Sequence, residues 1–381
     1  MRILVASPGT GSAGAERQAL ELAIDARDTG HLPTLAVSGT GPLLALADRA
    51  GIPYVGCRQP LWMGRRHARL AHLVGWVRTA QAVGSVLPAY VLLRRLRPDL
   101  VVTSSAAIPT LAIAAHLARI PHVWMVSETV HTNPSLRSGP PKRTLARLIA
   151  RLSTRMVFVS RFVRSEWQDA AGHAAPDEAI AYPRPTVVEA IPRAAGPVLR
   201  LLMAGTVAAE KGQLDAVAAL ALARQRGASS TLRLVGSGPE EYVAEVRAAI
   251  RRASLEQVCT LEGWADEVGP LYGQADVTLM LSEAEAYGRV TAEAVMSGCP
   301  VLGYATGATP EVLRHGGGVL VPADVGALAD EIVRLANDPD LLGSLTAQAR
   351  TAGAALAADP SQWQVIEGLL AEPATDRGRD R

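Results

Sequence analysis

The sequence predicts two α/β domains, each built on an open parallel β-sheet with helices on both faces. Its 381 residues exceed what one hydrophobic core usually organises, so we expect two domains. Short apolar runs alternate with helical patterns along the chain, which is typical of parallel sheets covered by helices. This alternation stops once, where prolines gather within residues 183–197, and we expect an interdomain linker there.

The first domain is expected to span residues 1–182. Its short apolar runs have the length of buried strands, and turn-forming residues or helical patterns separate them. We expect strands at residues 3–6, 35–37, 100–103, 122–126 and 156–159.

The second domain is expected to span residues 198–358 and repeats the same pattern. Its strands are expected at residues 198–204, 231–235, 258–261, 277–281 and 301–303. Two open sheets of this kind leave a cleft between their strand ends, where ligands usually bind. Residues 372–381 are expected to be disordered, because Pro, Gly, Asp and Arg replace the apolar periodicity there.

Composition excludes several classes of protein. Hydrophobic residues make up 49% and charged residues 19%, which argues against extensive disorder. A formal charge of +2 and only 4% aromatic residues argue against nucleic acid as a partner. Three distant cysteines without a nearby second ligand predict neither a zinc site nor disulfides, and reduced thiols point to the cytoplasm.

Hydropathy argues against a membrane-spanning protein. No apolar run reaches the length of about 18 residues that a spanning helix needs, and the first run is too short for a signal peptide.

The first candidate site lies where the strand at residues 198–204 ends. Gly205, Thr206 and Lys211 belong to a turn of small residues before a helix expected from Gln213. Small residues allow a ligand to approach the backbone, and amide groups at a helix start favour an anion. A lysine there is a ready partner for phosphate, although a glycine turn with a lysine also occurs without function.

A stronger signal follows the strand at residues 277–281. Glu285 is expected in the loop at the carboxyl edge of the sheet, and Glu293 follows after seven intervening residues, about one turn into a helix. Between them the backbone amides at residues 288–290 suit an anionic group. The alternative is structural: Glu293 would favour the positive end of the helix, and Glu285 would be solvated.

A glycine-rich loop at residues 7–16, which includes Gly14, follows the first strand. The glycine spacing differs from the Gly-x-Gly-x-x-Gly pattern of dinucleotide-binding folds, and no acidic residue ends the second strand. A nicotinamide-dependent enzyme is therefore disfavoured.

Together these segments resemble the retaining GT-B glycosyltransferases that carry a Glu, seven residues, Glu motif. Six segments carry the resemblance in order along nearly the whole chain: residues 14–16, 205–212, 236–239, 263–264, 285–293 and 298–301. The resemblance implies two Rossmann-like, doubly wound parallel-sheet domains that face a central cleft. It also implies that a helix within residues 359–371 crosses back to the first domain.

The resemblance further implies the role of each site residue. Lys211 would contact the donor diphosphate, Glu285 would hold hydroxyls of the transferred sugar, and Glu293 would bind the ribose. Gly14 would approach the donor phosphates from the opposite domain. Further donor-binding residues are expected at Gly205, Thr206, Gly236, Tyr287, Gly288, Arg289 and Val290.

The implied activity is transfer of a sugar from a nucleotide diphosphate sugar to an acceptor hydroxyl, with retention of anomeric configuration. No metal ion or cofactor is required, and cations and amide dipoles would stabilise the leaving diphosphate. We expect Glu285, Lys211 and Glu128 as catalytic residues; the acceptor is an unknown small molecule, glycan or lipid-linked group.

Two departures from the family pattern weaken this assignment. Similar proteins usually carry an arginine where this chain has Thr206, and Arg289 is the candidate to replace it. They also tend to carry a histidine where this chain has Ser127-Glu128-Thr129, so Glu128 or His131 would take that role, unless Glu128 is merely solvated.

Two alternatives remain open on these residues. One is a non-catalytic relative that binds nucleotide sugars or supports a partner enzyme. The other is a GT-B epimerase or hydrolase that acts on a nucleotide sugar without an acceptor.

An arginine-rich segment at residues 58–97 suggests a further partner. No acidic residue occurs between Asp48 and Asp99, while arginines alternate with Leu, Val and Trp. The segment would suit an anionic membrane surface or a phosphorylated, lipid-linked acceptor, which would allow peripheral contact with the inner membrane face. The alternative is a solvated arginine-rich helix.

Overall fold

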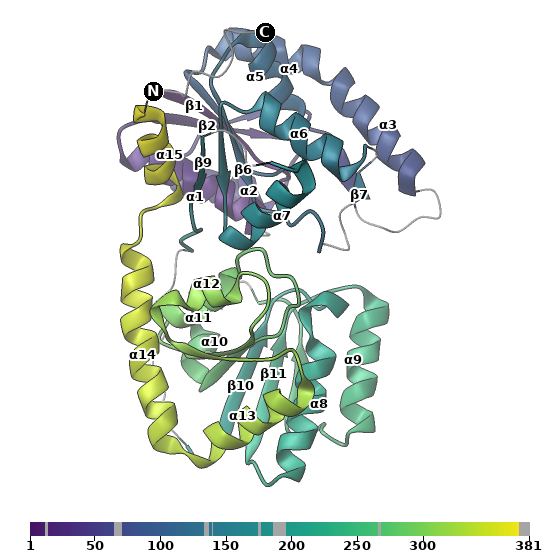
Figure 1. Cartoon of the computed structure of the whole chain (residues 1–381), viewed down its shortest axis with the longest axis vertical. Coiled ribbons are helices and arrows are strands. Elements are labelled where there is room, and N and C mark those ends of the chain that lie inside the picture. Colours follow the sequence, from purple (N-terminus) through teal and green to yellow (C-terminus); the bar gives the residue numbers. More distant parts are fainter. Residues whose placement is uncertain are drawn as a thin grey trace. The chain divides into compact units, whose positions relative to one another are not determined.

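The computed structural model describes residues 1–11, 14–64, 71–132, 137–138, 140–173, 177–185, 196–265 and 268–372 (Figure 1). The chain forms two compact units, of which unit 1 comprises Met1–Pro183 and Pro360–Arg381, and unit 2 comprises Arg184–Asp359. Most of the expected linker and nearly all of the expected disordered tail lie outside the described residues.

Unit 1 contains a seven-stranded parallel sheet in the order β3-β2-β1-β5-β6-β8-β9. The strands are β1 (Arg2–Ala6), β2 (Leu32–Val37), β3 (Tyr54–Gly56), β5 (Leu100–Thr103), β6 (His122–Val126), β8 (Arg155–Phe158) and β9 (Glu178–Ile180). A separate antiparallel pair joins β4 (Met63–Gly64) to β7 (Arg137–Ser138).

Helices cover both faces of this sheet because successive strand residues point to opposite sides. Ile3 and Val5 pack with α1 (Gly14–Asp28), α2 (Pro42–Ala50) and α15 (Gln362–Ala371). Leu4 and Ala6 pack with α4 (Val86–Leu96) and α5 (Thr110–Ala118). The remaining helices are α3 (Ala71–Gly84), α6 (Lys142–Leu152) and α7 (Arg161–Ala171).

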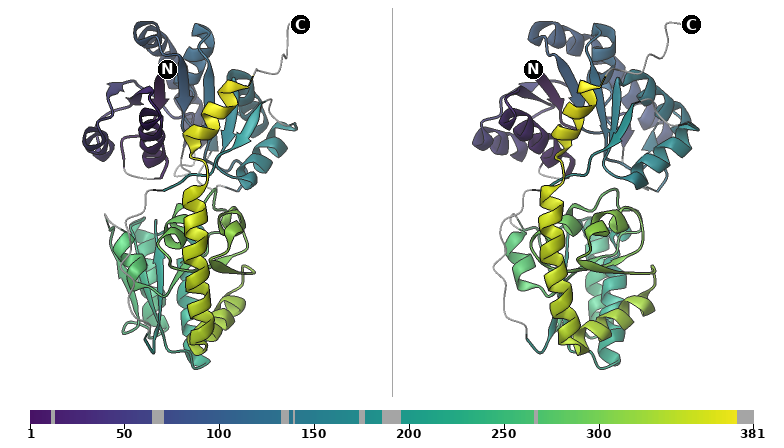
Figure 2. Two further views of the ribbon diagram at one scale, coloured as in Figure 1. Left: turned by 90° about the vertical axis from the view of Figure 1, so that its left-hand side faces the viewer. Right: turned by 60° about the vertical axis from the view of Figure 1, so that its left-hand side comes forward.

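The last helix, α15, is part of unit 1 although it follows the whole of unit 2 in sequence. Figure 2 shows it in yellow alongside the sheet and helices of unit 1. Trp363 is fully buried there, and its indole Nε1 donates a hydrogen bond to Thr29 Oγ1 at 2.8 Å. Unit 1 is therefore assembled from both ends of the chain.

Unit 2 contains a six-stranded parallel sheet in the order β12-β11-β10-β13-β14-β15. The strands are β10 (Leu199–Ala204), β11 (Ser230–Val235), β12 (Cys259–Glu262), β13 (Val277–Met280), β14 (Val301–Tyr304) and β15 (Gly318–Val321). One face packs on α8 (Gln213–Gln225), α9 (Glu240–Arg252) and α13 (Val325–Asn337). The other packs on α10 (Gly269–Gln274), α11 (Arg289–Met296) and α14 (Pro339–Ala358).

Each unit thus has the predicted architecture of a doubly wound parallel sheet, and this expectation is confirmed. All ten expected strands are present, with bounds that differ by a few residues. Within the described residues, no helix combines the length and apolar character needed to cross a bilayer.

The strand order of unit 2 creates the position for a site. The neighbours of β10 are β11 on one side and β13 on the other, so the connections that leave β10 and β13 diverge. Ligands of open α/β sheets bind outside the carboxyl ends of the strands at such a switch point.

Candidate active site

The loops after β10 and β13 flank this switch point and carry Lys211 and Glu285. After β10 the chain turns at Gly205, whose φ is 131°, and forms the short 3-10 helix η1 (Ala209–Lys211). The buried Gln213 braces the turn, because its Nε2 donates to the Thr206 carbonyl at 3.0 Å and its Oε1 accepts from the Ala208 amide at 3.3 Å. Lys211 therefore has a fixed backbone at the edge of the sheet.

Glycines allow the loops at this edge to pack backbone against backbone. A Cβ atom on Gly212 would lie 2.7 Å from the Leu281 carbonyl oxygen, and one on Gly236 would lie 1.7 Å from that of Gly205. A Cβ atom on Gly307 would lie 2.7 Å from both the amide nitrogen and the carbonyl oxygen of Glu285. Any larger residue at these positions would push the loops apart, so the glycines set the position of Glu285 relative to Lys211.

Lys211 and Glu285 form an ion pair across the switch point. The distance from Lys211 Nζ to Glu285 Oε2 is 2.6 Å, and the two side chains are 34% and 17% exposed. Burial alone would raise the pKa of Glu285, but the Lys211 ammonium and hydrogen bonds to the carboxylate outweigh it and lower the pKa below the usual range. Glu285 is therefore ionised at neutral pH.

The identity of Lys211 is unusual in this sequence. The 38 basic side chains of the chain include only two lysines, Lys142 and Lys211. The ammonium of Lys211 is a compact point charge, unlike the planar guanidinium of the arginines that make up the other basic side chains except Lys142.

The helix α11 begins directly after the Glu285 loop and carries Arg289 and Glu293. Gly288, with a φ of 89°, is its N-cap. Glu293 accepts a hydrogen bond from the Tyr272 hydroxyl at 3.1 Å, and Arg289 Nε lies 3.8 Å from Glu293 Oε1. Arg289 and Glu293 thus belong to one cluster on the first turns of α11.

The remaining predicted residues of unit 2 differ in exposure. Thr206 is exposed, while the Tyr287 side chain is buried in the unit. Val290 lies beside the other loop, because a Cβ atom on Gly205 would be 4.0 Å from Val290 Cγ2. The structure therefore brings Gly205, Lys211, Gly236, Glu285, Gly288 and Val290 together at one edge of the sheet.

Two predicted residues, Gly14 and Glu128, belong to unit 1. Gly14 is the exposed first residue of α1. Glu128 follows β6, and its carboxylate accepts hydrogen bonds from the Ser105 hydroxyl, from the Ala106 amide at 3.0 Å and from the Ser127 amide at 3.3 Å. Burial raises the pKa of Glu128. Its carboxylate is thus held within unit 1, and the catalytic role expected for it stays a prediction.

Three contributors to the site were missed by sequence reasoning. In the sequence Gln213 marks only the start of a helix, and Tyr272 is an isolated aromatic residue without a motif. Gly307 follows a strand in Thr306-Gly307-Ala308, so a turn signal was present, but nothing in the sequence linked it to Glu285.

Sequence comparisons match both halves of the chain to glycosyltransferase families. Residues 12–181 match the Glycosyltransferase Family 4 domain, and residues 199–338 match the Glycosyl transferases group 1 domain. The chain is 33% identical over 121 residues to N-acetyl-alpha-D-glucosaminyl L-malate synthase of Bacillus anthracis, which covers 31% of either chain. It is 29% identical over 281 residues to an exopolysaccharide phosphotransferase of Streptomyces coelicolor, covering 72% of this chain. The matched segments span about a third of the length of these two relatives.

Comparison with solved structures agrees with the fold. Anabaena HepE, solved in complex with UDP and glucose, superposes with a TM-score of 0.74 at 20% identity. The match covers 98% of this chain and 100% of HepE. Two sheets of the expected topology, the two family matches and this GT-B neighbour agree with one another. The chain belongs to the group 1 glycosyltransferases and has the GT-B fold.

Proposed function

We propose that the chain is an enzyme that transfers a sugar from a nucleoside diphosphate sugar to an acceptor hydroxyl, with retention and without a metal ion. The observation that carries the proposal is the Lys211–Glu285 pair at the switch point of unit 2. It joins a cation suited to a diphosphate with a carboxylate suited to sugar hydroxyls, at the sheet edge where ligands of such folds bind.

Each side chain of the pair has a separate task in this proposal. The Lys211 ammonium binds the diphosphate, and the amides at the start of α11 add dipoles of the same sign. Glu285 is ionised and therefore accepts hydrogen bonds from sugar hydroxyls. Glu293, oriented by the Tyr272 hydroxyl, binds the ribose. Arg289 supplies the second diphosphate cation that the exposed Thr206 does not.

The reaction breaks the bond between the anomeric carbon and the diphosphate oxygen and forms a bond from the same carbon to the acceptor oxygen. Negative charge grows on the leaving diphosphate while positive charge grows on the sugar ring. A fixed ammonium and fixed amide groups at the diphosphate stabilise this separation, because they need no reorganisation during the reaction. The acceptor proton neutralises the diphosphate product.

UDP-linked hexoses are the first donors to examine. HepE, which matches nearly the whole chain in structure, was solved with UDP and glucose, and this supports a UDP-linked hexose as the donor. The activity is proposed for the cytoplasm, in keeping with the free thiols of Cys57, Cys259 and Cys299.

Thermal-shift screening against UDP, GDP, ADP and dTDP sugars tests donor binding, because a ligand of the native state raises its melting temperature. We expect the sugars of one nucleotide to raise the melting temperature. Lys211→Ala should remove this increase, whereas Lys142→Ala should leave it unchanged. Equal shifts in both variants would contradict the assignment of Lys211.

Turnover separates the proposal from its two alternatives. Sugar transfer that Lys211→Ala abolishes supports a transferase, and binding without turnover across acceptors would favour a non-catalytic relative. Release of free or epimerised sugar without an acceptor would favour a hydrolase or epimerase. NMR of the product reports anomeric configuration, and activity retained in EDTA is expected for a metal-independent reaction.

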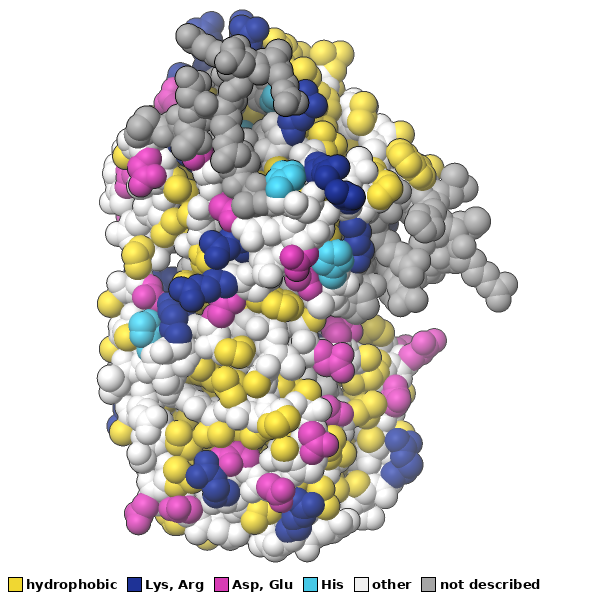
Figure 3. Space-filling view, viewed as in Figure 1, with side chains coloured by type: hydrophobic (Ala, Val, Ile, Leu, Met, Phe, Trp, Pro, Cys, Tyr) yellow, Lys and Arg dark blue, Asp and Glu magenta, His cyan; other side chains and the backbone are white. Residues whose placement is uncertain are grey.

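On the acceptor side we propose that unit 1 contacts an anionic membrane through α3 and α4. Five of the thirteen large hydrophobic side chains exposed within the described residues lie in this stretch: Trp76, Val77, Val83, Leu87 and Val91. Figure 3 shows hydrophobic side chains gathered at its upper right, over these helices. Trp76 is 55% and Leu87 71% exposed. A group of exposed apolar side chains of this kind marks an interaction surface and not a helix face that meets only water.

The charges on these helices fit an anionic lipid surface. Arg94 and Arg95 lie exposed in the last turn of α4, and no acidic residue occurs from Arg49 to Pro98. Apolar side chains with tryptophan enter the headgroup region, while arginines bind lipid phosphates. A lipid-linked acceptor would be presented at such a surface.

Liposome co-sedimentation tests the membrane contact. Replacing both Arg94 and Arg95 with Gln is expected to weaken binding to anionic vesicles about tenfold or more, since each arginine near such a surface contributes about 1 kcal/mol. The matched control is Gln at Arg251 and Arg252, an exposed pair at the end of α9. Leu87→Gln is compared with Leu320→Gln in the same way. Vesicle binding that does not depend on anionic lipid, or an equal loss of binding in each variant and its control, would contradict the proposed membrane contact.

A further inference from the structure

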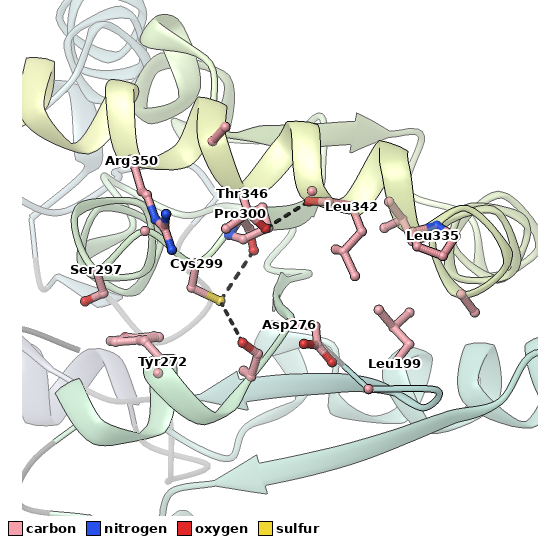
Figure 4. Close-up of a pocket in the computed structure, with 18 of the residues that line it drawn as sticks. Leu199, Tyr272, Asp276, Ser297, Cys299, Pro300, Leu335, Leu342, Thr346 and Arg350 are labelled. Atoms are coloured by element: carbon pink, nitrogen blue, oxygen red, sulfur yellow. Dashed lines mark hydrogen bonds between the residues drawn. The ribbon is translucent and has the colours of Figure 1, made fainter. Parts of the chain in front are cut away.

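A pocket lies in unit 2 at the opposite edge of the sheet from Lys211 and Glu285. It is formed where β10, β13 and β14 begin, and α10 and α14 close its sides (Figure 4). Its volume is about 380 Å³, which is within the range of about 300–1,000 Å³ of small-molecule sites. Of the residues assigned to the donor site above, Tyr272 lines this pocket, whereas Lys211, Glu285, Arg289 and Glu293 do not.

The walls of this pocket are mainly apolar. Leu199, Tyr272, Cys299 and Leu335 are buried and line it, and Leu342 joins them from α14. The Cys299 thiol is not reactive there, because burial raises its pKa to about 12. Such walls suit the apolar body of a ligand and bind it without covalent chemistry.

Two polar groups at the pocket are left without a protein partner. The Ser297 hydroxyl makes no hydrogen bond, but its oxygen is fully buried and is therefore closed to a ligand in the pocket. Arg350 points from α14 toward Ser297 and Cys299 (Figure 4), and no carboxylate pairs with it within the described part of the chain. Its stem is close to Gly298, because a Cβ atom there would lie 2.9 Å from Arg350 Cγ. Arg350 is solvent-exposed, so its guanidinium donors are available to a ligand.

The one carboxylate in the lining does not offset this charge. Asp276 is already paired with Arg200, whose guanidinium Nη2 lies 2.6 Å from Asp276 Oδ1, and it also accepts from the Arg200 amide at 2.7 Å. Arg350 is therefore the uncompensated charge of the pocket lining, and an anionic group is the complementary ligand feature.

Tyr272 connects this pocket to α11. Its ring lines the pocket, while its hydroxyl donates to Glu293 Oε2 at 3.1 Å. Burial and the nearby Glu293 charge raise the pKa of Tyr272, so the phenol stays protonated as a donor. A molecule packed against the ring would restrict Tyr272 and, through it, Glu293.

We propose that this pocket binds a small amphipathic carboxylate, held by Arg350 through its charged group, and that its occupancy orders α11 through Tyr272. The carboxylate lies against the guanidinium, and the apolar body fills the space between Leu199, Leu335 and Leu342. The effect on α11 concerns donor binding only if Glu293 has the role given to it under the proposed function, whereas the binding site stands independently of that role.

Binding is tested with 2-naphthoate and its uncharged counterpart 2-naphthamide by ligand-observed NMR. Naphthoate is expected to bind at least about tenfold more tightly, since charge-assisted hydrogen bonds are the stronger ones. Arg350→Gln is expected to remove this preference, and Gln at Arg252 is the control. Gly343→Leu is expected to abolish binding of both probes, because Gly343 lines the pocket and a side chain there meets open space.

The outcomes of this test separate the alternatives. Equal affinities of the two probes, or naphthoate binding that survives both Arg350→Gln and Gly343→Leu, would overturn the site. The melting temperature of each variant confirms that it is folded, and Gly343→Leu is expected to keep it or raise it, since glycine disfavours a helix interior.

Hydrogen exchange tests the connection to α11 without any donor. Saturating naphthoate is expected to slow amide exchange in residues 289–299 of the wild-type protein and to have no such effect in Tyr272→Phe, which still binds the probe. Unchanged exchange in the wild-type protein with the pocket occupied would refute the coupling. Failure of nucleotide binding alone would contradict the proposed function and leave this site unaffected.

Discussion

Among single residues, Lys211 and Glu285 carry the proposed function. Their side chains reach each other only because the loops after β10 and β13 are adjacent, although 73 residues separate them in sequence. The motif spacing predicted both residues, since glycine turns and paired glutamates leave a pattern. Tyr272 and Gly307 could not be predicted, because their role arises from contacts between elements.

The ion pair gives Glu285 a defined pH dependence. Its native pKa is lowered from 4.5, so the unfolded chain binds a proton first as the pH falls. The stability contributed by the pair is therefore complete above the unfolded pKa and is lost as the pH falls through the native one. Urea unfolding between pH 7 and pH 3 measures this effect. The difference in unfolding free energy between the wild-type protein and Glu285→Gln should become smaller below pH 4.5. A difference independent of pH would contradict the pairing.

Glu128 provides a second test at this scale. Glu128→Ala leaves the Ala106 and Ser127 amides without their acceptor, so we expect a loss of about 1–3 kcal/mol in the free energy of unfolding. Denaturant unfolding measures this loss, and turnover measured on the same variant reports the catalytic role separately. Unchanged stability would show that these hydrogen bonds do not hold the loop.

At the scale of elements, burial decides what the sequence could predict. The central strands of each sheet are continuous apolar runs and were predicted, as were the helices that open after Gly212 and Gly288. The edge strands β3, β9 and β15 were missed because they are partly exposed and lack such a run. The β4–β7 pair was missed because two residues per strand leave no periodicity.

Gly212 and Gly227 have similar backbone conformations, so a comparison of the two separates the cost of backbone strain from the cost of a steric clash. Gly212 has a φ of 82° and Gly227 one of 92°, so alanine costs about 1–2 kcal/mol at either position. A Cβ atom on Gly212 also meets Leu281, whereas one on Gly227 meets nothing within 4 Å. We expect Gly212→Ala to cost about 1–3 kcal/mol more in unfolding free energy and to weaken nucleotide binding. Equal costs would show that the loop contact is unimportant.

At the scale of the whole molecule, the chain returns to unit 1 after it has completed unit 2. The capping box of Ser361 and Gln364 starts α15, and Gln362 donates a hydrogen bond to the Ala181 carbonyl at 2.8 Å. His31 Nε2 and Glu367 Oε1 add a contact of 2.7 Å. Composition and alternating patterns predicted two α/β units, while the attachment of the last helix was expected only from resemblance.

The buried indole of Trp363 makes this attachment measurable. Trp363→Ala removes the packing and the hydrogen bond to Thr29, and we expect a loss of about 3–5 kcal/mol confined to unit 1. Hydrogen exchange should show β1, β2 and β9 losing protection while β10 to β15 keep theirs. Trp76→Ala, at an exposed position of the same unit, is expected to have an effect within about 0.5 kcal/mol. Uniform loss across both units would contradict a local role for α15.

Lysine-directed acetylation with mass spectrometry tests whether Lys211 binds the diphosphate of a nucleotide donor. The chain supplies its own control, because its only other lysine, Lys142, is exposed in α6 of unit 1. With UDP, GDP, ADP and dTDP tested in turn, we predict that one nucleotide slows modification of Lys211 severalfold and leaves Lys142 unchanged. If Lys211 were modified at the same rate with and without each nucleotide at saturating concentration, this role of Lys211 would be contradicted.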